Sequence, residues 1–201
     1  ATLPAASGVN LTALNATNIG SGTVPTARLG TGTASSSTFL RGDQTYAEAG
    51  GGKVLQVVNV VYTTESNTTN TFPLDTSIPQ NTEGAELTTA SITCSATSSK
   101  VLFFCSGELS SSAAGGALMV ALFKNSDADA LHVQTGFRDD ASYCSNYAFQ
   151  YEDSPSSVSE QTYKIRYGSN TGTSYVNRES DASGRWGGLR AWRITLMEIS
   201  A

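Results

Sequence analysis

Carboxylates occur in close pairs at three places in the sequence, and paired carboxylates are the groups with which glycoside hydrolases cleave sugars. The three pairs are Asp127 with Asp129, Asp139 with Asp140, and Glu152 with Asp153. All three lie in polar contexts typical of turns or strand ends, where Asp is common because its side chain hydrogen-bonds to the nearby backbone. We therefore expect no catalytic pair and interpret the chain as a non-enzymatic protein.

Two further patterns that carry chemistry are incomplete. Asp127-Ala128-Asp129 resembles the start of a calcium loop, but the next alternate position is Leu131 and no Gly occupies the sixth place. The single histidine, His132, has no nucleophile motif such as G-x-S-x-G in its local sequence, so an ordinary strand residue is expected there. The sequence thus predicts no metal site and no cofactor.

Binding residues are predicted instead, in two polar segments that each carry an aromatic side chain. The candidates are Trp186, Arg185, Tyr143, Asp139, Asp140 and Arg178. An aromatic ring can contact the apolar face of a sugar while carboxylates and Arg bind its hydroxyls, and aromatics and Arg also dominate protein-binding hot spots. The alternative is that Trp186 and Tyr143 fill the ends of the fold or an interface between subunits.

Charge and hydropathy exclude two classes of partner. Charged residues make up 14% of the 201 residues, and the formal net charge is -5, whereas nucleic-acid binding usually needs a basic stripe. No apolar run approaches the roughly 20 residues of a membrane-spanning helix. The chain starts with Ala and shows no signal-peptide pattern, so we expect a fragment or processed chain that assembles in the cytoplasm.

The three cysteines, Cys94, Cys105 and Cys144, are an odd number. A hairpin turn predicted at 96–99 would place Cys94 opposite Lys100 or Val101 and too far from Cys105 for a disulfide. We expect free, buried thiols in a reducing compartment, with a Cys94–Cys105 bridge as the alternative.

The composition changes after residue 52. Residues 1–52 contain four charged residues and two aromatic ones, which are Arg28, Arg41, Asp43, Glu48, Phe39 and Tyr46. Such a segment cannot bury enough apolar surface alone to offset backbone ordering. It is either a flexible linker or an extended stem that becomes ordered by wrapping around copies of itself, and 49–52 is a flexible joint.

Residues 53–201 show short apolar runs between turn clusters, which is typical of an antiparallel β-sandwich or jelly roll. Strands are expected at about 53–62, 86–95, 99–108, 116–124, 130–137, 144–152, 160–168, 173–178 and 189–199, with a turn at Ser66-Asn67. The predicted fold is therefore all-β, with an extended stem over 1–52 and a sandwich head over 53–201.

Three of these strands, 117–123, 101–105 and 192–199, are apolar on both faces. Antiparallel sheets usually bury one face and leave the other in water, so a second apolar face calls for a cover. We expect that cover to be another copy of the chain. The alternative is a loop or the stem of the same chain.

Several stretches resemble the fibrous virion proteins of bacteriophages. NLTALNATNIGSGTVPTARL (10–29) is similar to tail-fibre stem units, and GTASSSTFLRGDQTY (32–46) resembles the element that often ends such a stem, with Tyr46 where Trp is more usual. The ends of the second region resemble the limits of a phage fibre head domain, and three interior segments resemble parts of its interior. These ends and segments are 52–58, 195–199, 153–155, 162–164 and 175–178.

The resemblance implies a slender stem and a homotrimer with a jelly-roll tip, and it names no single receptor. The function expected is that of a virion fibre whose trimeric head binds a host cell-surface glycan or protein while the stem contacts phage tail or capsid proteins. The alternative is a capsid-decorating head fibre or cement protein that docks on the shell through residues 1–52. In this context Arg41-Gly42-Asp43 is expected to form a tight turn with an ion pair between subunits rather than an integrin ligand.

Overall fold

The computed structural model describes residues 24–48, 54–137, 143–181 and 183–200. Contacts divide the chain into two units, Ala1–Gly51 and Gly52–Ala201, and each is described here by itself. The predictions made for Asp139, Asp140 and most of the 10–29 stretch lie outside the described residues.

In the first unit the described residues form a short hairpin. Strand β1 (Thr38–Leu40) pairs antiparallel with β2 (Tyr46–Glu48), after the 3-10 turn η3 (Thr26–Arg28). The Arg41-Gly42-Asp43 turn is tight, because the Gln44 N–H donates to the Arg41 carbonyl at 2.9 Å. No residue of 24–48 is buried, in agreement with the expectation that this segment cannot form a core alone.

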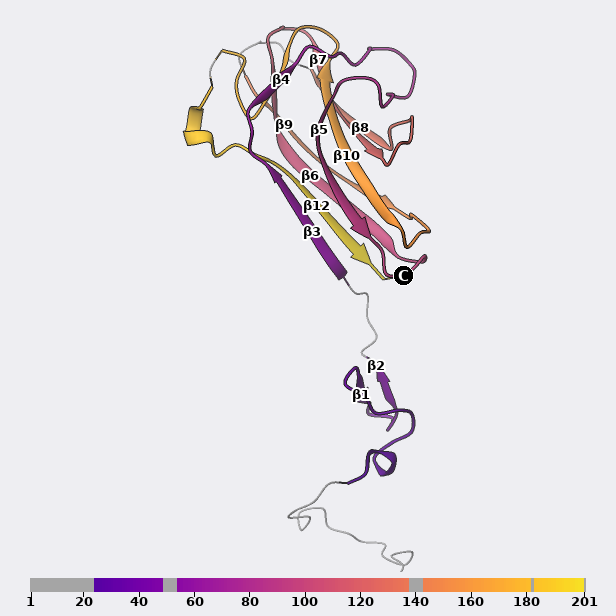
Figure 1. Cartoon of the computed structure of the whole chain (residues 1–201). Coiled ribbons are helices and arrows are strands. Elements are labelled where there is room, and N and C mark those ends of the chain that lie inside the picture. The colour runs from indigo at the N-terminus through magenta and orange to yellow at the C-terminus, as the bar shows by residue number, and fades with distance from the viewer. Residues whose placement is uncertain (1–23, 49–53, 138–142, 182, 201) are drawn as a thin grey trace, which may run out of the picture. The chain divides into compact units, whose positions relative to one another are not determined.

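The second unit is built of two antiparallel sheets, which confirms the all-β sandwich (Figure 1). One sheet has the order β5-β10-β7-β8, and the other has the order β3-β12-β6-β11-β4 with β9 also paired to β6. The strands are β3 (Val54–Tyr62), β4 (Ser66–Thr68), β5 (Ala85–Thr93), β6 (Lys100–Ser111), β7 (Ala117–Lys124), β8 (His132–Phe137), β9 (Ser145–Asp153), β10 (Glu160–Ser169), β11 (Ser174–Val176) and β12 (Trp192–Ile199).

All nine strands predicted over 53–201 are present, with ends displaced by three residues or fewer. The turn predicted at Ser66-Asn67 is wrong, because these residues belong to β4, which pairs with β11. The only helical elements described are the short 3-10 turns η3 and η4 (Arg185–Gly188). Within the described residues, no helix has the length and apolarity needed to cross a membrane.

The core lies between the two sheets and follows from the two-residue alternation of strand side chains. Phe103, Trp192 and Ile194 come from the six-stranded sheet, and Leu122 and Tyr163 come from the four-stranded sheet. All five are fully buried.

The second apolar face of β7 is covered by the chain itself. Met119, Ala121 and Phe123 form a separate buried cluster with Phe72, which belongs to the connection between β4 and β5. For this strand, therefore, the prediction of a partner copy is wrong and the loop alternative is correct. The connection contains three large apolar residues, Phe72, Leu74 and Ile78, and nothing in the sequence marks Phe72 for this role.

The outer face of the six-stranded sheet is different. Leu102 and Phe104 of β6 and Met197 of β12 are only half-buried there. Val57 and Val61 of the neighbouring strand β3 are 48% and 53% exposed. This apolar face, defined by these five residues, is called the outer face below.

None of the three cysteines, all of which the structure describes, forms a disulfide, and Cys94 and Cys105 are buried, as predicted, whereas Cys144 is only half-buried. The reason differs from the one expected, because β5 and β6 belong to different sheets and the 96–99 segment crosses between them instead of forming a hairpin. Burial raises the pKa of the Cys105 thiol to about 12, which makes it unreactive at neutral pH.

Candidate functional site

Glu152 and Asp153 do not form a carboxylate pair. Asp153 is buried, accepts a hydrogen bond from the Tyr163 hydroxyl at 2.7 Å and forms an ion pair with Lys124 at 3.0 Å. Burial, together with the bond to Asp153, raises the pKa of Tyr163. Glu152 is the preceding residue on the same strand and pairs with Lys100 on the surface, so the two carboxylates point to opposite faces.

Asp129 and His132 also have structural partners. The Asp129 carboxylate accepts a hydrogen bond from the Gln80 side chain at 2.7 Å. His132 lies on β8 with its ring centroid 4.7 Å from that of Phe149. These contacts fix a loop and a strand, which are the roles expected for these residues.

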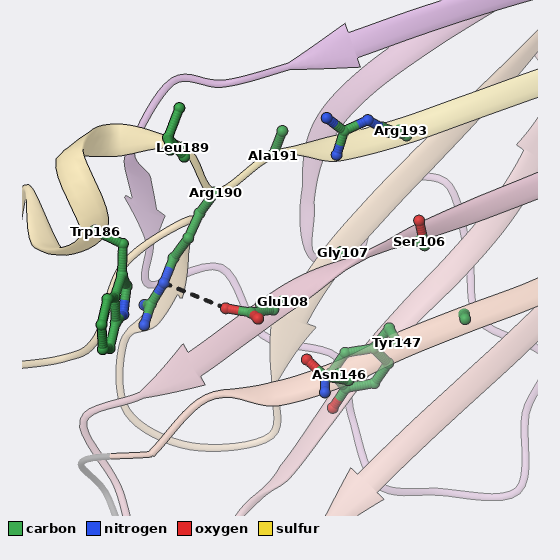
Figure 2. Close-up of a pocket in the computed structure, with 11 residues that line it drawn as sticks. Ser106, Gly107, Glu108, Asn146, Tyr147, Trp186, Leu189, Arg190, Ala191 and Arg193 are labelled. Carbon is green, nitrogen blue, oxygen red and sulfur yellow. Dashed lines mark ion pairs between the residues drawn. The ribbon is translucent and has the colours of Figure 1, made fainter.

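A groove of about 520 Å³ lies beside the η4 segment and is the candidate binding site (Figure 2). Its floor comes from β6, β9 and the start of β12, and its wall comes from η4 and the residues that follow it. The lining residues are Ser106, Gly107, Glu108, Asn146, Tyr147, Ala148, Trp186, Leu189, Arg190, Ala191 and Arg193.

The η4 segment, which forms one wall of the groove, lies at the end of the sandwich away from the first residue of β3 (Figure 1). This follows from the strand register, because Trp192 at the start of β12 pairs with Tyr62 at the end of β3. The chain therefore enters the domain at one end and forms the groove at the other.

Trp186 stands at the rim of the groove with 71% of its surface exposed. Its backbone is left-handed, with φ 60° and ψ 26°, which costs an L-residue about 1–2 kcal/mol. Gly184 and Gly187 on either side also have positive φ, and glycine adopts this conformation without strain. The local sequence therefore folds into a tight left-handed loop that holds a large aromatic ring in solvent.

Buried charges tie this loop to the sheet. Arg190 forms ion pairs with Glu179 (Nη2 to Oε1, 2.5 Å) and with Glu108 of β6 (Nε to Oε2, 3.4 Å). Burial acts to lower the pKa of Arg190, but the hydrogen bond to Glu179 and the neighbouring Cys144 and Glu108 raise it overall. In Figure 2, Arg190 and Trp186 point to the same side of the chain, and a dashed line joins Arg190 to Glu108.

Cys144 joins a second loop to this network. Its Sγ accepts a hydrogen bond from Arg190 Nη1 at 3.2 Å and donates one to the Arg178 carbonyl at 3.6 Å. Tyr143, the residue before it, is exposed. The structure thus brings the chain at Tyr143 to the same end of the sandwich as the Trp186 loop.

The two predicted arginines are engaged within the protein. Arg185 binds Glu179 at 2.6 Å and lies 3.9 Å from Asp181. The Arg178 guanidinium lies 5.1 Å from the centroid of the Tyr175 ring, and its Nε donates to the Glu179 carbonyl. Of the predicted residues that the structure describes, Trp186 and Tyr143 present exposed rings, whereas Arg185 and Arg178 hold the loop.

Sequence reasoning missed the residues that shape the groove, namely Arg190, Glu108, Glu179, Asn146 and Arg193. Glu108 gave one signal, since it is the only acidic residue of β6, whose one other charge, Lys100, stands at the first position of the strand. Arg193 lines the groove from β12 and is exposed, and the described part of the chain provides no ion-pair partner for it.

The fold and the groove define an antiparallel β-sandwich domain with an exposed tryptophan beside a groove at one end. No protein-family model matches the chain. No curated protein matches its sequence either.

Solved structures show a distant likeness to particles of infectious bursal disease virus. A chain of the Gx strain structure is 12% identical with a TM-score of 0.36, and the alignment covers 78% of this chain and 42% of that one. A chain of the VP2 subviral particle of the same virus is 11% identical with a TM-score of 0.36, and the alignment covers 78% of this chain and 42% of that one. This chain spans about two fifths of those chains, and at this TM-score the likeness carries no argument about function.

Proposed function

We propose that this chain is a fibrous virion protein of a bacteriophage, with a head domain that binds a glycan or protein on the host cell surface. Its stem-like sequences at 10–29 and 32–46 and the sandwich that follows them support the proposal. The groove beside Trp186 is the receptor site in this proposal.

One observation carries the proposal, which is the exposed and strained Trp186 in a loop that is anchored by the buried Arg190–Glu179 ion pair. A left-handed Trp in solvent adds no stability to the domain, and backbone strain of this kind persists where the surrounding structure imposes it, commonly at functional sites. The Arg190 ion pairs provide that support. A rigid aromatic platform beside polar groups such as Asn146 and Arg193 is suited to a sugar ring or to a protein hot spot.

The position of the groove also supports a receptor role. Residues 1–53 join the domain at the first residue of β3, and the groove lies at the other end of that strand. A receptor site on a fibre must be clear of the joint that attaches its domain, and the groove lies at the end of β3 remote from that joint.

A homotrimer is part of the proposal, and the outer face supports it. Val57, Val61, Leu102, Phe104 and Met197 leave apolar surface in water that a second copy would bury. Several trimers on one particle would raise the effective affinity through multivalency even if each groove binds its receptor weakly.

The proposal is tested with the full chain labelled with a fluorophore and mixed with a panel of bacterial strains. We expect binding to a subset of strains and a loss of about 30-fold on Trp186→Ala, which corresponds to a hot spot of about 2 kcal/mol. Equal binding of wild type and Trp186→Ala to every strain would remove the groove from the proposal.

Two further observations separate the alternatives. Antibody-labelled cryo-microscopy of the particle that carries this chain would place it on the tail or on the shell, and a position on the shell would favour the capsid-decorating alternative. Sustained release of sugar products from a surface polysaccharide would overturn the non-enzymatic interpretation.

A further inference from the structure

Strand β3 is an edge strand with an unusual lack of protection. It pairs only with β12 among the described strands, is nine residues long, and contains no charged residue and no Pro. Val57 and Val61 are exposed on its outer face, where Leu55 and Asn59 also point. Natural edge strands normally carry Lys, Pro or a bulge to prevent pairing with another chain, and β3 has one such irregularity, a register shift at Leu55 close to its first residue. From Gln56 to Tyr62 the edge is regular and uncharged, and it is available to a further strand.

Strand β9 forms the opposite edge of the same sheet. It is also nine residues long and pairs only with β6 among the described strands. Each neighbour in the series β3, β12, β6, β9 is antiparallel to the next, so β9 runs opposite to β3. A second copy in the same orientation would thus place its β3 antiparallel to β9 of the first, and the alternation of the sheet would continue unbroken.

The outer face extends from β6 onto β9, and two hollows lie in this part of the surface. One hollow of about 590 Å³ is lined by Phe104, Ala148 and Gln150, and another of about 470 Å³ by Leu102, Gln150 and Glu152. Apolar side chains protrude from β3, at the other edge of the same sheet. The two edges are thus complementary, with protruding valines on one and apolar hollows beside the other.

We infer that in the homotrimer proposed above β3 of each copy pairs with β9 of the next copy, so that three sheets close into a ring. This is a head-to-tail interface, which gives a closed assembly when the rotation between copies closes. The inference rests on the proposed homotrimer and adds the interface that builds it. In this ring β3 and β9 are no longer edge strands, and the outer face of each copy points towards the three-fold axis.

The dimensions of the sheet suit this closure. Four strands at a spacing of about 4.8 Å make a sheet about 19 Å wide. Three such sheets arranged as a triangular prism put the centre of each face about 5.5 Å from the axis, close to half of the roughly 10 Å at which sheets pack. Phe104 and Met197, on the two central strands, then lie near the axis and bury their apolar surface there.

The ring leaves the receptor groove at one of its ends. Val61, Arg193, Ser106 and Ala148 are aligned across the sheet in one row, and the last three line the groove. This is the last outward row that β3, β12, β6 and β9 share, because β3 ends at Tyr62 and β12 begins at Trp192. In the ring the three grooves therefore open around the axis at the end that carries Trp186, where a receptor can reach them.

Disulfide trapping in the full chain tests the interface. Asn59→Cys on β3 is combined in turn with Ala148→Cys, Gln150→Cys and Glu152→Cys, which all face outward on β9. Asn59 and Gln150 share a row of the sheet with two strands between them, about 14 Å apart, so a disulfide within one chain is excluded. The matched control is Asn59→Cys with Thr135→Cys on β8 of the other sheet, and wild type reports on the native cysteines.

The expected result is a ladder of covalent dimers and trimers for at least one of the three β9 positions, with none for the control or for wild type. A trimer by light scattering that forms no cross-link at any β9 position would overturn the β3–β9 interface and leave the homotrimer standing. Cross-linking of the Thr135→Cys control to the same extent would also overturn it, because the links would then report random collisions. A monomer by light scattering would overturn both the interface and the homotrimer.

Discussion

The Arg190 guanidinium and the Glu179 carboxylate lie 2.5 Å apart, with only 14% and 11% of their side chains exposed. The second oxygen of the same carboxylate binds Arg185 at 2.6 Å, but the Arg185 side chain is 52% exposed. The Glu179 carboxylate thus forms ion pairs with one buried arginine and one half-exposed arginine. The buried pair fixes the loop that carries Trp186, and the second pair joins the same buried carboxylate to an arginine that is half exposed.

The two arginines are expected to differ strongly in stability. Arg190→Ala leaves Glu179 as a buried charge without its main partner and should lower the free energy of unfolding by about 3–5 kcal/mol. Arg185→Ala removes a half-exposed partner and leaves Glu179 paired with Arg190, so it should cost about 0–1 kcal/mol. Urea unfolding of the two variants measures the difference, and equal effects would contradict the proposed role of Arg190.

Glu198 is a second buried charge, near the opposite end of the sandwich. Its carboxylate accepts hydrogen bonds from the Ser95 N–H and hydroxyl and from the Ser99 hydroxyl, each at 2.7 Å, and from Gln56 Nε2 at 2.8 Å. Burial acts to raise the pKa of Glu198, but these hydrogen bonds lower it from 4.5 to about 2. The bonds hold the 94–99 crossing between the two sheets.

The effect of Glu198 should depend on pH in a defined direction. Because its folded pKa lies below its unfolded value, the ionised group stabilises the fold above about pH 4.5, and this contribution is lost as pH falls through about 2. Glu198→Gln should cost about 1–3 kcal/mol at pH 7, and the difference from wild type should shrink between pH 4.5 and 2. Unfolding followed at several pH values, with the surface variant Glu152→Gln as control, checks this. If Glu198→Gln lowered the free energy of unfolding equally at every pH, the ionised Glu198 carboxylate would not be the source of the loss.

Gly107 is required by its contact with a core tryptophan. A Cβ atom at this position would lie 2.1 Å from Cδ2 of Trp192, which is fully buried and donates its indole N–H to the Glu108 carbonyl. Gly107→Ala should therefore destabilise the domain by about 2–3 kcal/mol through overpacking. The neighbouring variant Ser106→Ala should change stability by less than about 0.5 kcal/mol. Thermal unfolding compares the two, and a neutral Gly107→Ala would show that the ring moves freely.

A lysine on the edge strand should oppose assembly. Val57→Lys places a charge on the outer face of β3 and should weaken trimer association by about 10-fold or more, or about 1.4 kcal/mol. Val158→Lys is the matched control, since Val158 is similarly exposed but lies in the loop between β9 and β10. Analytical ultracentrifugation over a range of chain concentrations measures both. A trimer equally strong in the two variants would place the interface elsewhere.

The alternation of apolar residues was sufficient to predict the strands of the sandwich, because side chains on one face of a strand must meet the core. It was insufficient to pair them, since β5 and β6 are close in sequence but belong to different sheets. The same limit explains β7, whose outer cover comes from Phe72, 45 residues before the strand begins. Contacts of this kind depend on the path of the chain between strands.

The candidate site was predicted in part for the same reason. Trp186 and Tyr143 stood out as aromatics in polar loops, and the structure exposes both. Arg190 and Glu108 are 82 positions apart, and no local pattern indicates that their side chains meet. These side chains meet because the sheet brings β6 and the start of β12 together, and the sequence alone does not indicate that pairing.

The most direct test of the receptor role is the affinity of the trimeric chain for cells that it binds, measured by flow cytometry for wild type and single variants. We expect Trp186→Ala to lose about 30-fold in affinity while it remains a folded trimer. Phe39→Ala, which removes an exposed aromatic ring from the first unit, should bind like wild type. A folded trimer of Trp186→Ala that binds as tightly as wild type would contradict the account.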